Sequence, residues 1–157
     1  MDEIKENARP LGGYNNMKPE KEKMVELTED GIDLAGAMEK LKSPKNGAIA
    51  SYFSSVRNTS KGKTTAGLTY PGEGSSRVLE QMKKLRKNAL NKYDIRDAVM
   101  IQRIGSLKPG DNILFVGISA ATRTPAFEAC SYIIDRIKAE VHPGWKKEMF
   151  QNGVDRI

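Results

Sequence analysis

The stretch that most constrains the fold is a short apolar run that leads into a turn of small residues and then into a long helical pattern. The run, Ile113 to Ile118, is almost continuously apolar, which is typical of a strand buried on both faces. The helix behind it is expected to start with Thr124 as N-cap and Pro125 at the first helical position. Other elements must therefore cover both sides of this strand.

Apolar residues recur at helical spacing along the predicted helix and form one stripe. They are Ala126, Phe127, Cys130, Ile133, Ile134, Ile137 and Val141. Lys138 lies at the edge of this stripe, so we expect it to be partly desolvated, which favours the neutral form of a lysine. Two further lysines, Lys146 and Lys147, follow the Pro143-Gly144 break and stand beside Trp145, the only tryptophan.

Turn, helix and following strand would together bring four cationic residues to one wall of a pocket. They are Arg123, Lys138, Lys146 and Lys147. The alternative for each lysine is a solvated position, because a lysine at the edge of an apolar stripe usually extends its amine into water. Spacing alone does not separate a catalytic lysine from a solvated one.

Length and composition indicate one domain with a short extension before it. The chain has 157 residues, enough for a core of its own. Residues 1–22 are rich in proline, glycine, asparagine and charge, which predicts a flexible N-terminal arm, with a single domain over 23–157. No apolar segment is long enough to span a bilayer and no signal peptide is visible, so we expect a cytoplasmic protein.

The single cysteine and the single histidine exclude several kinds of site. One cysteine fits a reducing cytosol and excludes an internal disulfide framework. Cys130 lies in the apolar stripe and is expected to be a core residue rather than a nucleophile. His142 alone provides neither a Cys/His cluster for zinc nor a His-based triad. We therefore expect no metal and no cofactor.

The formal net charge of +6 indicates an anionic partner. Nucleic acid, an anionic small molecule and an acidic protein all fit. A lysine-rich helix at 83–87 adds to the basic surface, but there is no long basic run and there are few aromatic residues to stack on bases. The charge does not choose among these partners.

The remaining elements alternate irregularly. Strands are expected at 24–27, 48–56, 66–70, 98–104 and 145–150, and helices around Leu34–Leu41 and after an N-cap at Ser75 or Ser76. Tight turns join some neighbouring strands, including a hairpin turn at Asn152-Gly153. This order favours an α+β, or mixed α/β, fold with a partly antiparallel sheet.

Arg57 is delivered at the end of the strand 48–56 and begins a polar, basic loop. Its Gly62-Lys63-Thr64 triplet resembles the end of a phosphate-binding loop. The earlier glycine of that motif would have to stand at position 57, where this chain has arginine, so a nucleotide-binding loop is rejected.

Four motifs occur in a fixed order. They are Gly47-Ala48-Ile49 running to Val56-Arg57-Asn58; Arg103-Ile104-Gly105-Ser106-Leu107-Lys108-Pro109-Gly110-Asp111; Ala121-Thr122-Arg123 with Ala126-Phe127-Glu128-Ala129; and Lys138 followed by Pro143 and Trp145-Lys146-Lys147-Glu148. In this combination and at these spacings, the chain from about Met24 resembles the large, catalytic subunit of molybdopterin synthase, the MoaE family.

The resemblance implies an α/β hammerhead-type fold and a homodimer of large subunits within a heterotetramer. A small ubiquitin-like sulfur-carrier subunit, MoaD-like, would insert its thiocarboxylated C-terminal tail into the pocket. The implied reaction is sulfur transfer to cyclic pyranopterin monophosphate, which forms the molybdopterin dithiolene. No cysteine is needed in such a sulfurtransferase, because the partner brings the sulfur.

The resemblance also implies roles for particular residues. Lys138 and Lys146 match the catalytic lysines. Positions matching Arg57, Thr122, Arg123 and Lys147 contribute to a substrate pocket near the large-subunit dimer interface. A pocket of arginines and lysines suits both a cyclic phosphate and an anionic tail.

Several positions depart from the family pattern. Thr122 and Gln102 stand where the family usually has histidines, and the spacing from Lys138 to Lys146 is one residue longer. The loss of the two histidines leaves open a non-catalytic paralogue that binds a ubiquitin-like partner. The net charge and the lysine-rich helix at 83–87 leave open a basic nucleic-acid-binding domain.

Overall fold

A computed structural model describes residues 23–150 and 153–156, so the predicted arm 1–22 lies outside the described residues. The elements in chain order are β1 (Val25–Thr28), α2 (Leu34–Leu41), β2 (Ala48–Ser55), β3 (Thr59–Ser60), β4 (Lys63–Tyr70), α3 (Ser75–Lys92), β5 (Asp97–Arg103), β6 (Gly105–Leu107), β7 (Asn112–Ala120), α4 (Arg123–Arg136), the π-helical turn η2 (Ile137–Val141), β8 (Lys147–Phe150) and β9 (Gly153–Arg156). The α+β class predicted from the sequence is confirmed.

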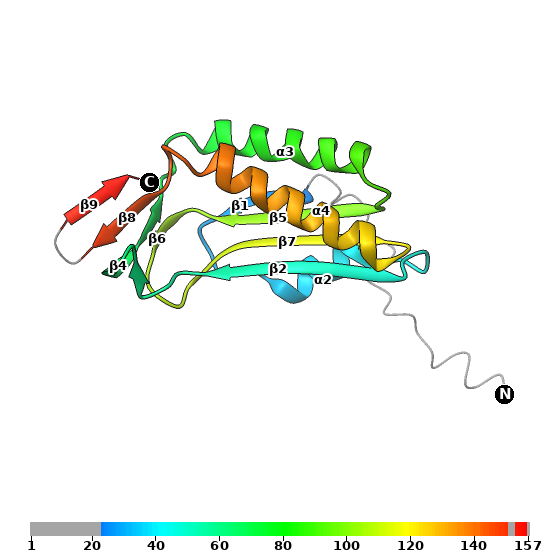
Figure 1. Ribbon diagram of the computed structural model, residues 1–157, viewed down its shortest axis with the longest axis horizontal. Helices are drawn as coiled ribbons and strands as arrows, with labels where there is room; N and C mark the ends of the chain where they lie inside the picture. The colour runs from blue at the N-terminus through cyan, green and yellow to red at the C-terminus, as the bar shows by residue number, and fades with distance from the viewer. Residues whose placement is uncertain (1–22, 151–152, 157) are drawn as a thin grey trace.

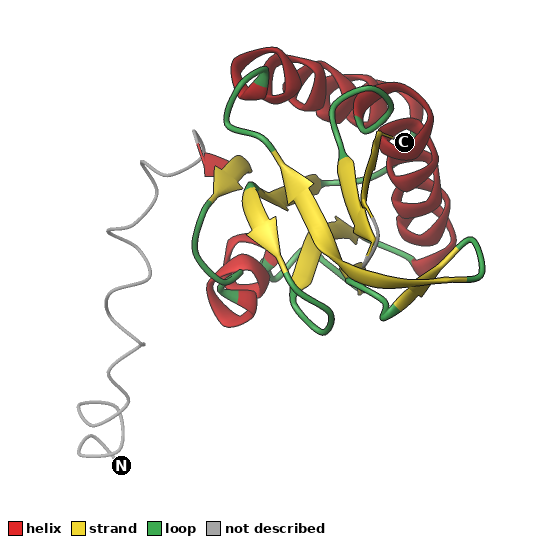
Figure 2. Cartoon of the chain, turned by 90° about the vertical axis from the view of Figure 1, so that its left-hand side faces the viewer, coloured by secondary structure: helices red, strands yellow, loops and turns green. Residues whose placement is uncertain are grey.

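Two sheets share the strands. The larger has the order β1-β5-β7-β2, in which β1 and β5 are parallel and the other pairs antiparallel. The smaller has the order β3-β4-β8-β9, with β6 also paired to β4. Figure 1 shows α3 and α4 on one face of the larger sheet, α2 on the other, and the smaller sheet at one end of the molecule. Figure 2 shows the same layers from the end of the smaller sheet.

The apolar strand β7 lies at the centre of the larger sheet, and every residue from Ile113 to Ala120 is buried. Leu114, Val116 and Ile118 belong to the main core, together with apolar residues of α3 and α4. Phe115 belongs to a second, smaller core with Leu41 of α2. The predicted burial on both faces is therefore confirmed, because successive side chains of a strand alternate between faces.

Gly117 in β7 is required by this close packing. A Cβ atom placed there would lie 2.6 Å from Cδ1 of Leu41 and 2.8 Å from the ring of Phe115. A larger residue at this position would force the side chains of Leu41 and Phe115 to move.

Several predicted boundaries are corrected. Helix α4 begins at Arg123 with Thr122 in the N-cap position, two residues earlier than predicted, and Pro125 is its third residue. A proline is tolerated there because the first four amides of a helix have no intrahelical acceptor. Gly74, rather than Ser75 or Ser76, occupies the N-cap position of α3. Phe127, expected in the apolar stripe, is 61% exposed.

The segment 58–63, predicted to be a loop, is a hairpin of β3 and the start of β4. Lys61 and Gly62 form its two-residue turn with φ of 53° and 75°. Positive φ at both central residues is typical of the turns that join antiparallel strands. The sequence did not reveal this hairpin because β3 has only two residues. The short strand β6 was not predicted either.

The C-terminal hairpin was predicted and is present. Strands β8 and β9 are antiparallel, with Phe150 paired to Gly153. Asn152 of the predicted turn lies outside the described residues. Strand β8 begins at Lys147, so Trp145 and Lys146 belong to the turn before it. In the part of the chain that the structure describes, no helix is long and apolar enough to cross a membrane.

Candidate active site

A cavity of about 670 Å³ lies where the end of β2, the β3–β4 hairpin and the segment from η2 to β8 meet. Three of the predicted site residues line it: Arg57, Lys138 and Lys146. Among the described residues none of these three cations forms an ion pair with a carboxylate. Cationic residues that are far apart in the sequence therefore line one cavity, as the sequence predicted for Lys138 and Lys146.

A larger, open groove of about 1790 Å³ runs along α2 on the opposite face of the sheet. Two of its lysines are paired with carboxylates: Lys40 lies 4.0 Å from Glu26, and Lys42 lies 2.9 Å from Glu39. Three further carboxylates line the same groove, those of Asp30, Asp33 and Asp97. A groove with locally neutralised charges has less to offer an anion than the smaller cavity. The smaller cavity is therefore the candidate active site.

Arg57 is held at the cavity by the backbone just before it. The amide of Val56 donates to the carbonyl of Asp111 at 2.9 Å, and the amide of Gly110 donates to the carbonyl of Val56, also at 2.9 Å. These bonds tie the end of β2 to the turn before β7. The predicted delivery of Arg57 by this strand is correct.

Lys138 lies in the π-helical turn η2, where the amide of His142 donates to the carbonyl of Ile137 at 3.0 Å. This turn is wider than an α-turn by one residue. It adds one residue to the stretch between the two lysines relative to a regular α-helical turn.

The side chain of Lys138 is exposed, so the predicted desolvation of this lysine is wrong. Its Nζ lies 5.5 Å from the ring centroid of Tyr52 on β2. The stripe places Lys138 beside the sheet, but its amine extends past the aromatic ring into the open cavity.

Lys146 has the desolvated amine. It is half-buried, and burial is the main cause that lowers its pKa below the usual value for a lysine. The positive charges of Lys138, Arg57 and Lys61 lower it further, while the negative charge of Glu148 raises it. The lowered pKa makes the neutral amine of Lys146, the form that accepts a proton, more available than that of an unperturbed lysine.

Glu148 lies beneath the cavity and is only 2% exposed. Its Oε1 accepts a hydrogen bond from Thr65 Oγ1 at 3.1 Å, and its Oε2 has no hydrogen-bond partner among the described residues. A buried carboxylate beside several cations partly compensates their mutual repulsion. The sequence pattern did not identify this role for Glu148.

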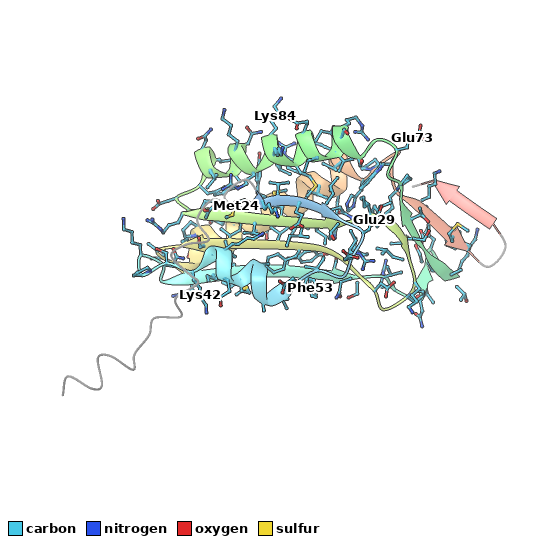
Figure 3. All side chains as sticks on the ribbon, turned by 180° about the vertical axis from the view of Figure 1, so that it is seen from behind. Met24, Glu29, Lys42, Phe53, Glu73 and Lys84 are labelled. Carbon is cyan, nitrogen blue, oxygen red and sulfur yellow. The ribbon has the colours of Figure 1, made fainter. Side chains whose placement is uncertain are left out.

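An aromatic cluster packs beside the cavity, and two of its members, Tyr70 and His142, line it. The rings of Tyr70, His142 and Trp145 pack together, with Tyr70 at 5.2 Å from each of the other two centroids. Trp145 Nε1 donates to the carbonyls of Pro71 at 3.0 Å and Glu73 at 3.2 Å. The tryptophan therefore ties the turn that carries Lys146 to the loop before α3. Figure 3 marks Glu73 at that end of α3.

Cys130 is buried among core residues, as predicted. Burial raises the pKa of its thiol to about 11, so it is not a thiolate near neutral pH.

Thr122 and Arg123 do not join this cavity within one chain. They stand at the start of α4, whereas Lys138 lies beyond its end, about 22 Å away at 1.5 Å per helical residue. Figure 1 shows the start of α4 at the end of the molecule opposite the smaller sheet. Lys147 is half-buried in β8 and is not among the residues that line the cavity. The prediction that all four cations share one wall is therefore wrong for Arg123 and Lys147.

Comparisons with known proteins identify the family. The profile of the MoaE protein family matches residues 27–140. The molybdopterin synthase catalytic subunit of Thermoplasma volcanium is 38% identical over 130 residues, which cover 82% of this chain and 93% of that protein.

Two solved structures extend the comparison. The crystal structure of molybdopterin synthase from Staphylococcus aureus matches with a TM-score of 0.75 and 26% identity, and the match covers 85% of this chain and 96% of that one. A complex of subunits 1 and 2 of molybdopterin-converting factor from Helicobacter pylori matches with a TM-score of 0.64, covering 85% and 89%; at 16% identity this likeness is one of fold. By sequence profile, identity and fold together, this chain belongs to the MoaE protein family.

Proposed function

We propose that this chain is the catalytic subunit of a molybdopterin synthase. It would transfer sulfur from the thiocarboxylated C-terminus of a small ubiquitin-like subunit to cyclic pyranopterin monophosphate. The observation that carries this proposal is the convergence of Arg57, Lys138 and Lys146 on one cavity without carboxylate partners among the described residues. Both the precursor phosphate and the incoming tail are anionic, and such a site suits both.

The geometry distinguishes the roles of the two lysines. Lys146, with its lowered pKa, would exchange protons as sulfur attacks and oxygen leaves. Lys138, exposed at the mouth beside Tyr52, would hold an anionic group of the substrate or the tail. Arg57 would bind the phosphate, because its planar guanidinium donates two parallel hydrogen bonds.

We place Thr122 and Arg123 in the substrate pocket of a second copy of the chain. One chain supplies the lysines, and the start of its α4 lies about 22 Å away along the helix. A homodimer in which α4 of one copy approaches the cavity of the other would complete the pocket. With one small subunit per large subunit, the assembly would be a heterotetramer.

The direct test mixes purified protein with thiocarboxylated small subunit and precursor and measures dithiolene formation. We expect Lys146→Ala to reduce the rate by about 10²- to 10⁴-fold, as for loss of a general acid or base. Lys138→Ala should reduce it by about 10- to 100-fold, as for loss of a charge-assisted hydrogen bond. Lys84→Ala is the matched control, because Lys84 lies on the outer face of α3, away from the cavity (Figure 3). Undiminished turnover in both site variants would contradict the proposal. A tight complex without product from the unaltered chain would favour the non-catalytic alternative.

A further inference from the structure

The only histidine of the chain, His142, lies between the two lysine-bearing segments and has no part in the chemistry above. It is 8% exposed and lines the cavity. Its Nε2 lies 2.8 Å from Oε1 of Gln102, which is fully buried in β5. A buried polar pair of this kind is costly unless each group has its partner.

The hydrogen bonds of Gln102 determine the tautomer of the histidine. The amide nitrogen of Gln102 donates to the carbonyl of Arg103 at 2.8 Å, so its oxygen is the atom that faces the ring. An amide oxygen only accepts, and His142 Nε2 must therefore carry a proton. In a neutral ring Nδ1 is then the unprotonated nitrogen.

The backbone of His142 connects both lysines. Its amide donates to the carbonyl of Ile137, the residue before Lys138, at 3.0 Å. Its carbonyl accepts from the amide of Lys146 itself at 3.0 Å and from that of Trp145 at 3.1 Å. A displacement of the His142 backbone would therefore move the turn before Lys138 and the turn that carries Lys146.

We propose that His142 is the positioning residue of the two-lysine site: Gln102 clamps its ring as the Nε2–H tautomer, and its backbone fixes Lys138 and Lys146 relative to each other. This inference rests on the proposed function for its catalytic consequence, but not for its geometry.

The surroundings keep the ring uncharged. Burial is the main cause that lowers the pKa of His142 to about 3, and the positive charges of Lys146 and Lys138 add to it. Across the ring, β4 contributes Tyr70, whose pKa is raised by burial and by Glu148, so that it is a neutral phenol. From β5 the partner is the neutral amide of Gln102. A proton on Nδ1 would add a cation beside two amines.

The first experiment observes His142 directly. As the only histidine, it gives one set of imidazole signals in ¹⁵N-labelled full-length protein. We expect the shifts of a neutral Nε2–H ring that does not titrate between about pH 5 and 9. A ring that titrates near 6.5, the ordinary histidine value, or an Nδ1–H tautomer would overturn the clamp.

The second experiment separates positioning from simple packing. In His142→Gln the side-chain amide reaches the place of Nε2 and retains a donor for Gln102, whereas in His142→Asn it is too short. The titration of Lys146 is followed by ¹³C-lysine NMR, with Lys146→Arg to assign the signal. We expect His142→Gln to keep the midpoint of the unaltered chain and His142→Asn to raise it by about one pH unit. Equal midpoints in both variants would overturn the proposal.

The sulfur-transfer activity of the same His142 variants is measured separately from the Lys146 titration. In the sulfur-transfer assay, His142→Asn should lower kcat by roughly 10- to 100-fold with little change in KM, and His142→Gln should restore most of it. If the unaltered chain transfers no sulfur, the proposed function fails, while the Lys146 titration still decides the positioning role. Should His142→Asn not fold, Gln102→Met removes the same acceptor at similar volume; an unchanged Lys146 midpoint in that variant would also overturn the proposal.

Discussion

The two ends of the helix formed by α4 and η2 differ in nearly every respect. At the start, Thr122, Arg123 and Phe127 are exposed, and Phe127 is the most exposed large apolar side chain among the described residues. At the end, the wide turn and His142 are tied to β5 and to the turn before β8. The end of the helix is packed and hydrogen-bonded within the chain. At its start, cationic and apolar side chains are exposed to solvent in a single copy. The difference teaches that the two ends of one helix can have different tasks: its end is fixed by contacts within the chain, and its start is free to contact another chain, as proposed for a second copy.

The sharpest test of this comparison mixes two inactive variants. Arg123→Ala and Lys146→Ala would each be strongly impaired as homodimers, Arg123→Ala by roughly 10- to 100-fold because a charge-assisted hydrogen bond is lost. In a mixed dimer one site carries both changes and the other carries neither. Activity should therefore reappear on mixing after dissociation and reassociation, measured as dithiolene formed per dimer.

The control for this experiment mixes Lys138→Ala with Lys146→Ala. Both lysines line the same cavity of one copy, so every site in every mixed dimer remains altered and no activity should return. Recovery in the control, or none in the Arg123→Ala mixture, would show that the start of α4 is not part of a shared pocket.

His142, at the end of the helix formed by α4 and η2, should also make the free energy of unfolding depend on pH. His142 has a pKa of 6.5 when unfolded and about 3 when folded, so the unfolded chain binds a proton that the folded chain does not. Stability from this group is complete above pH 6.5 and falls with pH down to about 3, by up to about 1.4 kcal/mol per pH unit. Urea unfolding at several pH values measures this slope. His142→Gln should reduce it, and an identical slope in that variant would assign the acid sensitivity to other groups.

A smaller effect is expected from Glu148. Its negative charge raises the pKa of Lys146, so Glu148→Gln should lower that pKa further. Since the proposed base acts as the neutral amine, the acidic limb of the pH–rate profile should move to lower pH, with a change of about two- to tenfold in rate at a fixed acidic pH. A limb that moves to higher pH would contradict the proton-exchange role of Lys146.

The smallest effect is expected from Cys130→Ala. The thiol is buried in the main core and the sulfur comes from the partner, so sulfur transfer should keep its rate. Loss of the buried sulfur should lower the unfolding free energy by about 1 kcal/mol, measurable by urea unfolding. Loss of sulfur transfer in a folded Cys130→Ala variant would mean that the chain's own thiol takes part.

Sequence patterns predicted the elements better than the environment of single side chains. The continuous apolar run of β7 and the spacing of Ile133 and Ile137 identified buried elements because burial of many residues leaves a periodic record. The same spacing misjudged Lys138, because a long flexible side chain can leave the edge of a stripe for water. The helical spacing also predicted burial for Phe127, which is exposed. Spacing indicates which face of a helix is apolar, but it gives no information about how far the sheet under that face extends.

The site was only partly predictable for a related reason. Arg57, Lys138 and Lys146 were found because they belong to recognisable motifs, whereas His142 and Glu148 act through partners 40 and 83 residues away in the chain. Contacts over such separations have no local signature. The role proposed for Arg123 requires a second copy, and the sequence of one copy contains no geometric information about how two copies meet.

The π-helical turn has a consequence for how this region tolerates changes in length. Adding one residue to an ordinary α-helix rotates everything after it by about 100°, which would aim the following amine away from its neighbour. In η2 the hydrogen bond from the amide of His142 to the carbonyl of Ile137 spans one residue more than an α-helical turn, and Ala139 and Glu140 within it are exposed. A shorter chain with a regular turn here can therefore present the same two amines, and a gap at this point in a comparison of sequences need not signify a rearranged site.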